Sequence, residues 1–309
     1  MTSTLTVGFV GVGRMGWPMA RNIAAASFPT WVYDADRARA ERFAAECGGR
    51  AAASLEVLGG AADLVVTMLP TGCDVRSVVL GGADSQGLVS SLREGTIVVD
   101  MSSSDPLGTR ELGAALRARG IALIDAPVSG LVAKAETGTL TIMIGTDDEA
   151  ALARAEPVLR VLGERLVRVG SLGCGHAMKA LNNVVAATAF TITAEALIVG
   201  KRFGLDPAVM VDVMSTSTGR NFHTEVSFPG HVLTRRFATG FALGLLAKDV
   251  AIAADLSAAL GTEAPVIDLV SRLAAEGRDE VGADEDNTAI VKRWERLNGV
   301  VLSSREHDE

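Results

Sequence analysis

The chain has 309 residues, with 29 Lys or Arg against 37 Asp or Glu, which gives a formal net charge of −8. This length allows two domains, each with its own hydrophobic core. A net negative charge offers no basic field to a phosphodiester backbone, so a nucleic-acid partner is not expected. The 3 cysteines lack metal-ligand spacing and cannot all pair, which favours a reducing cytoplasm.

Residues 184–200, VVAATAFTITAEALIVG, form the most apolar stretch of the chain. Glu195 and three threonines interrupt it, whereas a membrane-spanning helix needs roughly 20 continuous apolar residues. We therefore expect a long core helix and no membrane partner. Because so apolar a helix suits a monomer surface poorly, we expect a homodimer or homotetramer. Residues 1–13 lack the basic leader of a signal peptide, and residues 303–309 read as a solvated tail.

The first half of the chain alternates short β-branched runs with alanine-rich helical stretches. Continuous apolar runs ending in turn residues are typical of strands buried on both faces of a parallel sheet. Such strands are expected at residues 5–10, 31–34, 64–69, 96–100 and 122–128. Helices are expected between them, for example at residues 15–27 and at 106–120, where Gly120 stops the helix. The alternation predicts an α/β fold, a doubly wound parallel sheet of the Rossmann type.

Two more strands are expected at residues 140–145 and 165–170, with a helix at 147–162 between them. After Gly170 the strand signals stop and the pattern becomes helical. Asp206 and Pro207 form a typical helix start for residues 206–218. We therefore predict a Rossmann domain over residues 1–170 and an all-α domain over residues 171–309, joined by a long interdomain helix.

A glycine array lies where the first strand gives way to a helix, in GFVGVGRMGWPMA. In a Gly-x-Gly-x-x-Gly loop the first glycine permits a tight turn and the second lets a pyrophosphate approach the backbone. The third allows the helix to pack closely on the strand, while the helix N-terminus faces the anion. The loop therefore predicts a dinucleotide cofactor. The cofactor-binding residues expected in it are Gly11, Gly13, Arg14, Met15 and Gly16.

Asp34 ends the next strand and is placed to bind the adenosine ribose hydroxyls, where its charge would repel a 2′-phosphate. This favours NAD, with NADP as the alternative because Arg37 and Arg39 follow closely. Ligands of doubly wound sheets bind at the carboxyl ends of the strands. We therefore expect Leu69, Pro70 and Ser102, which follow the third and fourth strands, to line the cofactor path.

Four motifs in order, GVGRMGWPMARN, DAPVSG with AETGTLTIMIG, GCGHAMKALNN and LLAKDV, resemble the signatures of the β-hydroxyacid dehydrogenases. That family includes 3-hydroxyisobutyrate dehydrogenase and tartronate semialdehyde reductase, and it is related to 6-phosphogluconate dehydrogenase. The resemblance implies that Lys179 is the catalytic acid/base and that Asn183 orients the substrate. It also implies that Ser129 and Gly130 bind the substrate carboxylate and that Lys248 reaches cofactor and substrate.

The residue types suit alcohol oxidation. A neutral amine can take the hydroxyl proton while hydride leaves the carbon, and an ammonium group can return it in the reverse direction. Asn183 lies four residues after Lys179, one helical turn away on the same face. Arg220 is a candidate second carboxylate contact in a loop that also contains His223, although a surface turn is an equal reading.

Two features of the sequence depart from the family or lack a partner. The substrate loop of the family usually reads Ser-Gly-Gly, whereas this chain has Leu131 after Gly130, which adds bulk where substrate is expected. His176 has no assignable carboxylate partner, so we expect a partly exposed histidine at a helix start. No arrangement of His, Asp or Glu predicts a metal site.

The leading hypothesis is an NAD-dependent dehydrogenase of a small 3-hydroxy acid, similar to 3-hydroxyisobutyrate. The first alternative is an NADPH-linked reductase of a small aldehyde acid such as tartronate, glyoxylate or succinic semialdehyde. A third is a non-catalytic dinucleotide-binding protein, against which the presence of both Lys179 and Asn183 argues.

Overall fold

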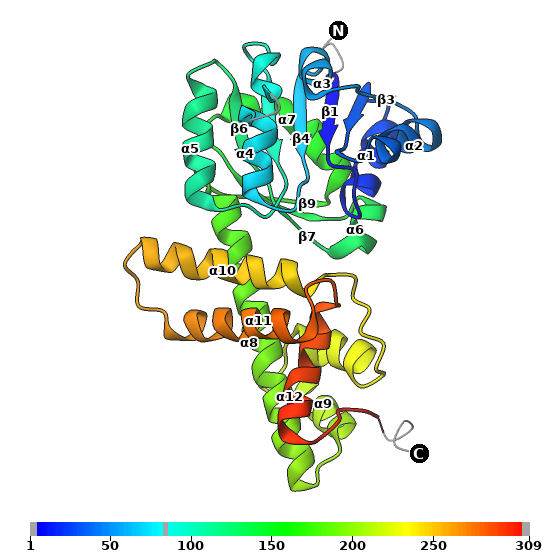
Figure 1. Cartoon of the computed structure of the whole chain (residues 1–309), viewed down its shortest axis with the longest axis vertical. Coiled ribbons are helices and arrows are strands. Elements are labelled where there is room, and N and C mark those ends of the chain that lie inside the picture. The colour runs from blue at the N-terminus through cyan, green and yellow to red at the C-terminus, as the bar shows by residue number, and fades with distance from the viewer. Residues whose placement is uncertain (1–4, 83–85, 305–309) are drawn as a thin grey trace. The chain divides into compact units, whose positions relative to one another are not determined.

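The computed structural model describes residues 5–82 and 86–304 (Figure 1). Two expectations fall partly outside these ranges. Residues 1–4 belong to the N-terminal stretch that was compared with a signal peptide, and residues 305–309 belong to the expected solvated tail. The chain divides into two compact units, one ending at Lys179 and the other beginning at Ala180.

The first unit contains one sheet of nine strands. They are β1 (Val7–Val10), β2 (Thr30–Tyr33), β3 (Arg50–Ala51), β4 (Leu64–Thr67), β5 (Ile97–Asp100), β6 (Ala122–Asp125), β7 (Val128–Ser129), β8 (Thr141–Gly145) and β9 (Arg165–Gly170). The order β3-β2-β1-β4-β5-β6 is all parallel and is that of a doubly wound dinucleotide-binding sheet. Successive strands are added on one side of β1 up to β3 and on its other side from β4 onward, and such sheets bind their ligands at this switch point.

Alternate side chains of each central strand enter two different cores, so the sheet is covered on both faces. Phe9 and Val66 belong to one core, to which helices α1 (Gly16–Ala25), α2 (Arg37–Cys47), α6 (Leu131–Thr137) and α7 (Glu149–Leu162) are closest. Val65 and Val98 belong to the other, packed by α3 (Leu55–Ala61), α4 (Gly72–Leu80), η1 (Leu88–Ser90) and α5 (Pro106–Arg117). Burial on both faces explains why these strands are continuous apolar runs.

The sheet departs from the predicted one beyond β6. The run at 122–128 is not one strand, because Ala126 and Pro127 separate β6 from β7 and Pro127 has no N–H to donate to a ladder. β8 pairs antiparallel with both β6 and β7 and parallel with β9. The predicted doubly wound parallel sheet is therefore confirmed, with antiparallel pairing of β8 at this edge. The short strand β3 was also not predicted, and α5 ends at Arg117, three residues before Gly120.

The second unit is helical in the residues described from Ala180 onward, which contain no strand longer than a single bridge. Its elements are the greater part of α8 (Cys174–Phe203), then α9 (Pro207–Ser215), the π-helix η2 (His223–Val232), α10 (Leu243–Ala259), α11 (Pro265–Val281), η3 (Asn287–Ile290) and α12 (Val291–Asn298). Its core centres on α8, which contributes Val184, Phe190 and Leu197 among others.

Within the described residues, α8 is the helix long and apolar enough to cross a membrane by length and composition alone. Half of its most apolar window is buried inside the protein. The expected long helix is therefore present and contributes to the core of the second unit, although only part of its apolar surface is buried.

Candidate active site

The glycine loop has the shape that a pyrophosphate needs. Gly11 has φ +94°, and a Cβ there would lie 2.4 Å from the Met68 carbonyl oxygen. A Cβ on Gly16 would lie 1.8 Å from the Gly11 oxygen, whereas a Cβ on Gly13 would meet no atom within 4 Å. Met15 precedes α1 without a side-chain cap, and the first turn carries no acidic residue. Space beside Gly13 and an uncapped helix start fit a dinucleotide phosphate.

Asp34 fastens this loop to the end of β2. Its Oδ2 accepts the Val12 N–H at 2.9 Å, and its Oδ1 accepts the Asp36 N–H at 2.9 Å. Arg39 Nη1 also lies 3.1 Å from Oδ1, although 41% of the arginine side chain stays exposed. The carboxylate is ordered by these donors and still has lone pairs for ribose hydroxyls.

The loops after β4 and β5 are joined to each other. Ser102 Oγ accepts the Leu69 N–H at 2.9 Å, and the Ser102 N–H donates to Asp100 Oδ1 at 3.0 Å. Ser102 is 1% exposed, so its oxygen is used inside the protein to hold the Leu69–Pro70 loop. This network sets the shape of the predicted cofactor path at the carboxyl edge of the sheet.

The expected substrate loop follows β7 directly. Ser129 and Gly130 are half-buried, and Gly130 has φ +143°. Leu131 begins α6 with φ +59° and a side chain that is 41% exposed. The backbone at Leu131 thus has the left-handed conformation that favours glycine, the residue that the family resemblance implies there.

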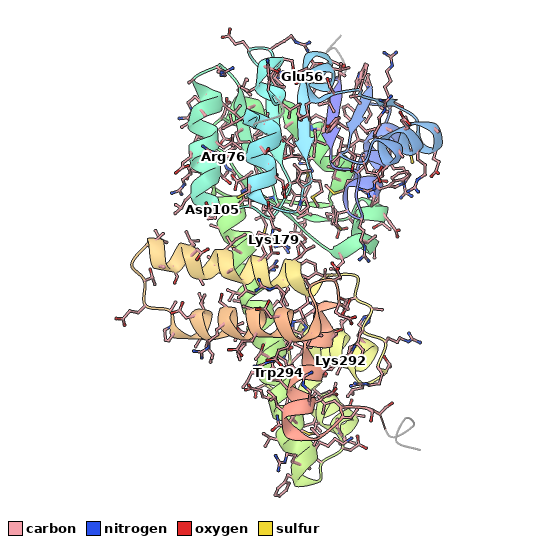
Figure 2. The ribbon with its side chains drawn as sticks, in the orientation of Figure 1. Glu56, Arg76, Asp105, Lys179, Lys292 and Trp294 are labelled. Atoms are coloured by element: carbon pink, nitrogen blue, oxygen red, sulfur yellow. The ribbon has the colours of Figure 1, made fainter. Side chains whose placement is uncertain are left out.

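The start of α8 is held against the sheet of the first unit. The carboxylate of Asp125, at the end of β6, accepts the N–H groups of Gly173 and His176, both at 2.8 Å. A Cβ on Gly175 would lie 2.5 Å from the Met143 carbonyl oxygen, so only glycine allows this approach. Lys179 follows on the same helix, half-buried (Figure 2).

His176 is not the partly exposed residue that the sequence suggested. It is 1% exposed, and its Nδ1 lies 2.8 Å from Thr109 Oγ1. Its Nε2 faces Asp100 Oδ2 at 3.6 Å, and Nδ1 lies 3.9 Å from Asp125 Oδ2. Burial raises the pKa of the Asp125 carboxyl, against the opposing effects of His176 and the backbone N–H groups. The expectation failed because both carboxylates come from strands distant in sequence.

In the second unit Asn183, Asp249 and Lys248 form a polar cluster. Asn183 Nδ2 donates to Asp249 Oδ2 at 2.6 Å, and Lys248 Nζ lies 3.0 Å from Asp249 Oδ1. Asp249 is 3% exposed, so a buried carboxylate is hydrogen-bonded to Asn183 and lies at ion-pair distance from Lys248. The sequence reasoning named Lys248 and missed Asp249, although an acidic residue on the apolar stretch of α10 was a usable signal. Asn182 donates to Asn183 Oδ1 at 3.2 Å.

Arg220 and His223 contact residues other than those of that cluster. Arg220 is exposed, and its Nε lies 2.6 Å from Glu225 Oε1. His223 is 7% exposed, with Nδ1 2.9 Å from Ser227 Oγ and Nε2 2.9 Å from the Ala186 carbonyl oxygen. Burial lowers the pKa of His223, against the smaller raising effect of the Ala186 carbonyl. His223 therefore joins η2 to α8 as a neutral group.

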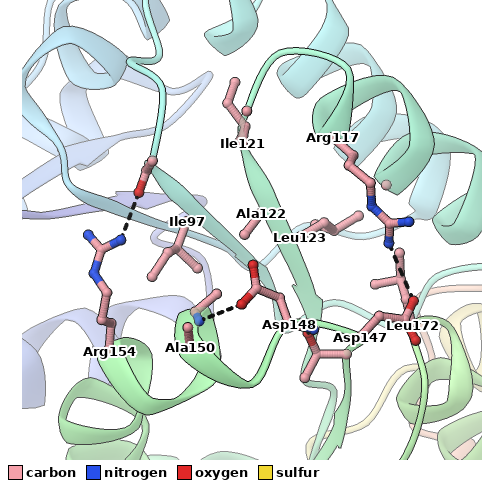
Figure 3. A pocket seen from close by; sticks show the side chains of 15 residues that line it. Ile97, Arg117, Ile121, Ala122, Leu123, Asp147, Asp148, Ala150, Arg154 and Leu172 are labelled. Atoms are coloured by element: carbon pink, nitrogen blue, oxygen red, sulfur yellow. Dashed lines mark hydrogen bonds and ion pairs between the residues drawn. The ribbon is translucent and has the colours of Figure 1, made fainter.

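A cavity of about 280 Å³ lies beside the start of β6, between α5 and α7 (Figure 3). None of the predicted site residues lines it. Its charged groups have partners, since Arg117 pairs with Asp147 and Arg154 donates to the Gly95 carbonyl. The cavity is separate from the glycine loop and from α8 beyond its first residues.

A doubly wound sheet with this glycine loop and a helical second unit defines a dinucleotide-dependent oxidoreductase. Residues 6–170 match the family described as the NAD-binding domain of 6-phosphogluconate dehydrogenase. Residues 173–294 match the family described as NAD-binding of NADP-dependent 3-hydroxyisobutyrate dehydrogenase. The chain belongs to the β-hydroxyacid dehydrogenase family.

Three relatives illustrate the range of that family. The chain is 33% identical to 2-(hydroxymethyl)glutarate dehydrogenase of Eubacterium barkeri, over 98% of this chain and 99% of that protein. It is 33% identical to the NAD-dependent L-serine dehydrogenase of Pseudomonas aeruginosa, over 95% and 99%. Its structure resembles that of Mycobacterium tuberculosis 3-hydroxyisobutyrate dehydrogenase with L-serine, with a TM-score of 0.85 and 32% identity over 94% and 99%. The chain is therefore an NAD(P)-dependent hydroxyacid dehydrogenase.

Proposed function

We propose that this protein oxidises a small 3-hydroxy acid, similar to 3-hydroxyisobutyrate, with NAD and with Lys179 as the general acid/base. The observation that carries the proposal is the cluster of Asn183, Lys248 and buried Asp249, which begins one helical turn after Lys179. A buried carboxylate that orders an amide and an ammonium group is costly for stability alone and is typical of a site that binds a polar ligand.

The proposed roles follow from the chemistry of each side chain. The Lys179 amine removes the hydroxyl proton, and its ammonium form returns a proton in reduction. The Asn183 amide, ordered by Asp249, orients the substrate hydroxyl without adding charge. Ser129 and the Gly130 N–H hold the substrate carboxylate, and the Lys248 ammonium adds positive charge for it. A bound nicotinamide ring accepts or supplies the hydride.

Arg220 is left out of these roles because its guanidinium is already paired with Glu225. Its role as a second carboxylate contact stays a prediction. The three relatives described above take their names from acids that differ in size and charge, so the acid used by this chain is open to direct test. We favour a small one, because Leu131 adds a bulky side chain next to Ser129 and Gly130, where the family resemblance implies a glycine.

The preference for NAD rests on Asp34. Its carboxylate is already ordered toward the glycine loop by the Val12 N–H, and a negative charge in this place repels the 2′-phosphate of NADP. An NADPH-linked reductase would need Arg39 to leave Asp34 and Asp36, which it bridges at 3.1 and 3.3 Å.

We also propose that the protein is a homodimer or homotetramer. Val185, Ile192 and Val199 recur every seven residues on α8 and, with Phe203, form an apolar stripe, called here the α8 stripe. Their exposed fractions are 68%, 59%, 69% and 85%. An apolar row of this kind supports association with a second copy.

The test is initial-rate oxidation of 3-hydroxyisobutyrate, L-serine and 2-(hydroxymethyl)glutarate with NAD and, separately, with NADP. The same acids are then assayed with Lys179→Ala and with Lys292→Ala, a half-buried lysine of α12 that pairs with Glu285 and serves as the control (Figure 2). We expect turnover with NAD, lost in Lys179→Ala and kept in Lys292→Ala, while both variants still bind NADH. Turnover only with NADP, or an active Lys179→Ala variant, would contradict the proposal.

A further inference from the structure

The buried histidine one turn before Lys179 has a contact pattern that assigns its protons. Thr109 Oγ1 donates to the Asp105 carbonyl oxygen at 2.8 Å, so the hydroxyl oxygen accepts from Nδ1 of His176. Nδ1 therefore carries a proton. Nε2 is buried without a hydrogen-bond partner among the described residues, and the nearest charged atom is Asp100 Oδ2 at 3.6 Å.

A lone pair on Nε2 would face a carboxylate oxygen, which is repulsive, whereas an Nε2–H would be attracted to it. Asp100 is itself fixed, because its two oxygens accept from Thr67 Oγ1, the Ser102 N–H and Ser104 Oγ. The ring of His176 is therefore held between Asp100 and Asp125, with Nε2 facing the first carboxylate at 3.6 Å and Nδ1 lying 3.9 Å from the second.

The contacts of His176 with Thr109, Asp100 and Asp125, called here the clamp, restrain the rotation of α8 about its own axis. The Asp125 carboxylate binds the backbone of the first turn at two residues, which fixes where the helix starts. The His176 ring, bonded to Thr109 of α5 and facing Asp100 of β5, adds a side-chain restraint on the rotation of the helix. Lys179 lies three residues later on the same helical face, so its direction follows from that of His176.

We propose that His176 is a positioning residue for Lys179, clamped between Asp100, Asp125 and Thr109 at the start of α8. This inference rests on the proposed function for its catalytic consequence. It predicts that loss of the ring lowers the rate of the chemical step without weakening dinucleotide binding, because the clamp lies under α8 and leaves the glycine loop intact.

The test compares His176→Leu, which removes both ring nitrogens, with His176→Gln, whose amide can still donate toward Asp100. For 3-hydroxyisobutyrate, or the acid of the panel that is turned over fastest, we expect His176→Leu to lower kcat about 10- to 100-fold, the range seen when a supporting hydrogen-bond partner is lost or a reacting group is misplaced. KM and the Kd for NADH should stay near the wild-type values. His176→Gln should recover most of kcat, and His231→Leu, in η2, is the control.

A double-variant measurement separates positioning from general damage. If His176 acts through Lys179, then His176→Leu should cost little further rate in the Lys179→Ala background. If the rate losses of the two single variants multiply in the double variant, the inference is overturned. The same holds if His176→Leu alone keeps kcat within about twofold of wild type. Should His176→Leu fold poorly, Thr109→Val keeps the ring but removes the acceptor of Nδ1, together with the bond to the Asp105 carbonyl, and should lower kcat in the same direction.

Amide hydrogen exchange gives a readout independent of activity. Exchange at residues 174–179 should rise in His176→Leu while exchange in α1 and at residues 11–16 is unchanged. Unchanged exchange at residues 174–179 would overturn the clamp. If Lys179→Ala proves active, the general-base assignment fails by itself, and the exchange result still decides whether His176 fixes this turn.

Discussion

Leu131 occupies a backbone conformation that suits glycine. A non-glycine residue at φ +59° carries a steric cost between Cβ and the backbone. Its side chain is substantially exposed, so little packing offsets that cost. The surrounding loop therefore imposes this backbone conformation, and Leu131 adopts it at a steric cost.

The first prediction concerns this strain. Leu131→Gly should be more stable than Leu131→Ala by about 1 kcal/mol, because both lose the same exposed side chain and only glycine loses the Cβ clash. Urea unfolding of the two variants measures the difference in the free energy of unfolding. An alanine variant as stable as the glycine variant would show that Leu131 is not strained.

The second prediction concerns cofactor choice. Asp34→Ala should lower the ratio of kcat/KM for NAD to that for NADP by at least about tenfold, the size of one charge-assisted hydrogen bond. Removing the carboxylate deletes the ribose acceptor and releases Arg39 toward a phosphate. Asp36→Ala is the matched control, since Asp36 also pairs with Arg39 but does not bind the glycine loop. An unchanged ratio in Asp34→Ala would refute the role of this carboxylate.

At the scale of elements, η2 is joined to α8 through a neutral histidine. The Ala186 carbonyl can only accept, so His223 donates from Nε2, and Nδ1 accepts from Ser227. Both ring nitrogens are satisfied without a charge. Protonation would reverse the direction of the Ser227 hydrogen bond and place a cation in a buried site.

This gives the third prediction. Burial lowers the pKa of His223 below its ordinary value of 6.5, so the unfolded chain takes up the proton at a higher pH than the folded chain. The stabilisation is complete above pH 6.5, and it is lost as the pH falls from 6.5 toward the lower folded pKa. In urea unfolding, His223→Gln should lose this slope, because glutamine still donates to Ala186 and does not titrate.

The stability difference between wild type and His223→Gln should therefore shrink between pH 7.5 and pH 5.5, two pH values about one unit either side of an unperturbed histidine pKa. Asp125, whose raised pKa acts in the opposite direction, is present in both proteins and cancels from the difference. A difference that does not change with pH would contradict the neutral assignment.

Most elements could be predicted because their signals are local. Buried parallel strands are continuous apolar runs, and helix starts such as Asp206 with Pro207 carry their own cap. The break at Ala126 and Pro127 was missed because the run of apolar residues continues through it. The clamp around His176 could not be predicted, since its partners come from β5, β6 and α5. Asp249 could have been, because it stands beside Lys248.

For the whole molecule, the fourth prediction concerns association. Ile192→Glu, in the middle of the α8 stripe, should convert the protein to monomers, because a buried, unpaired carboxylate in an apolar interface is strongly unfavourable. Size-exclusion chromatography with light scattering measures the mass. Leu260→Glu, at a comparably exposed leucine after α10, is the control and should leave the mass unchanged. A monomeric wild type, or an Ile192→Glu variant of unchanged mass, would refute the interface.

Association through the α8 stripe, as proposed above, would make protein concentration a variable of every experiment. Mass action favours the assembled form as the chain becomes more concentrated, so its melting temperature should rise on concentration and fall on dilution. Rates measured on dilute enzyme and stabilities measured on concentrated protein would then describe different species. In a cell, the amount of this chain that is synthesised would set how much of it is folded and assembled.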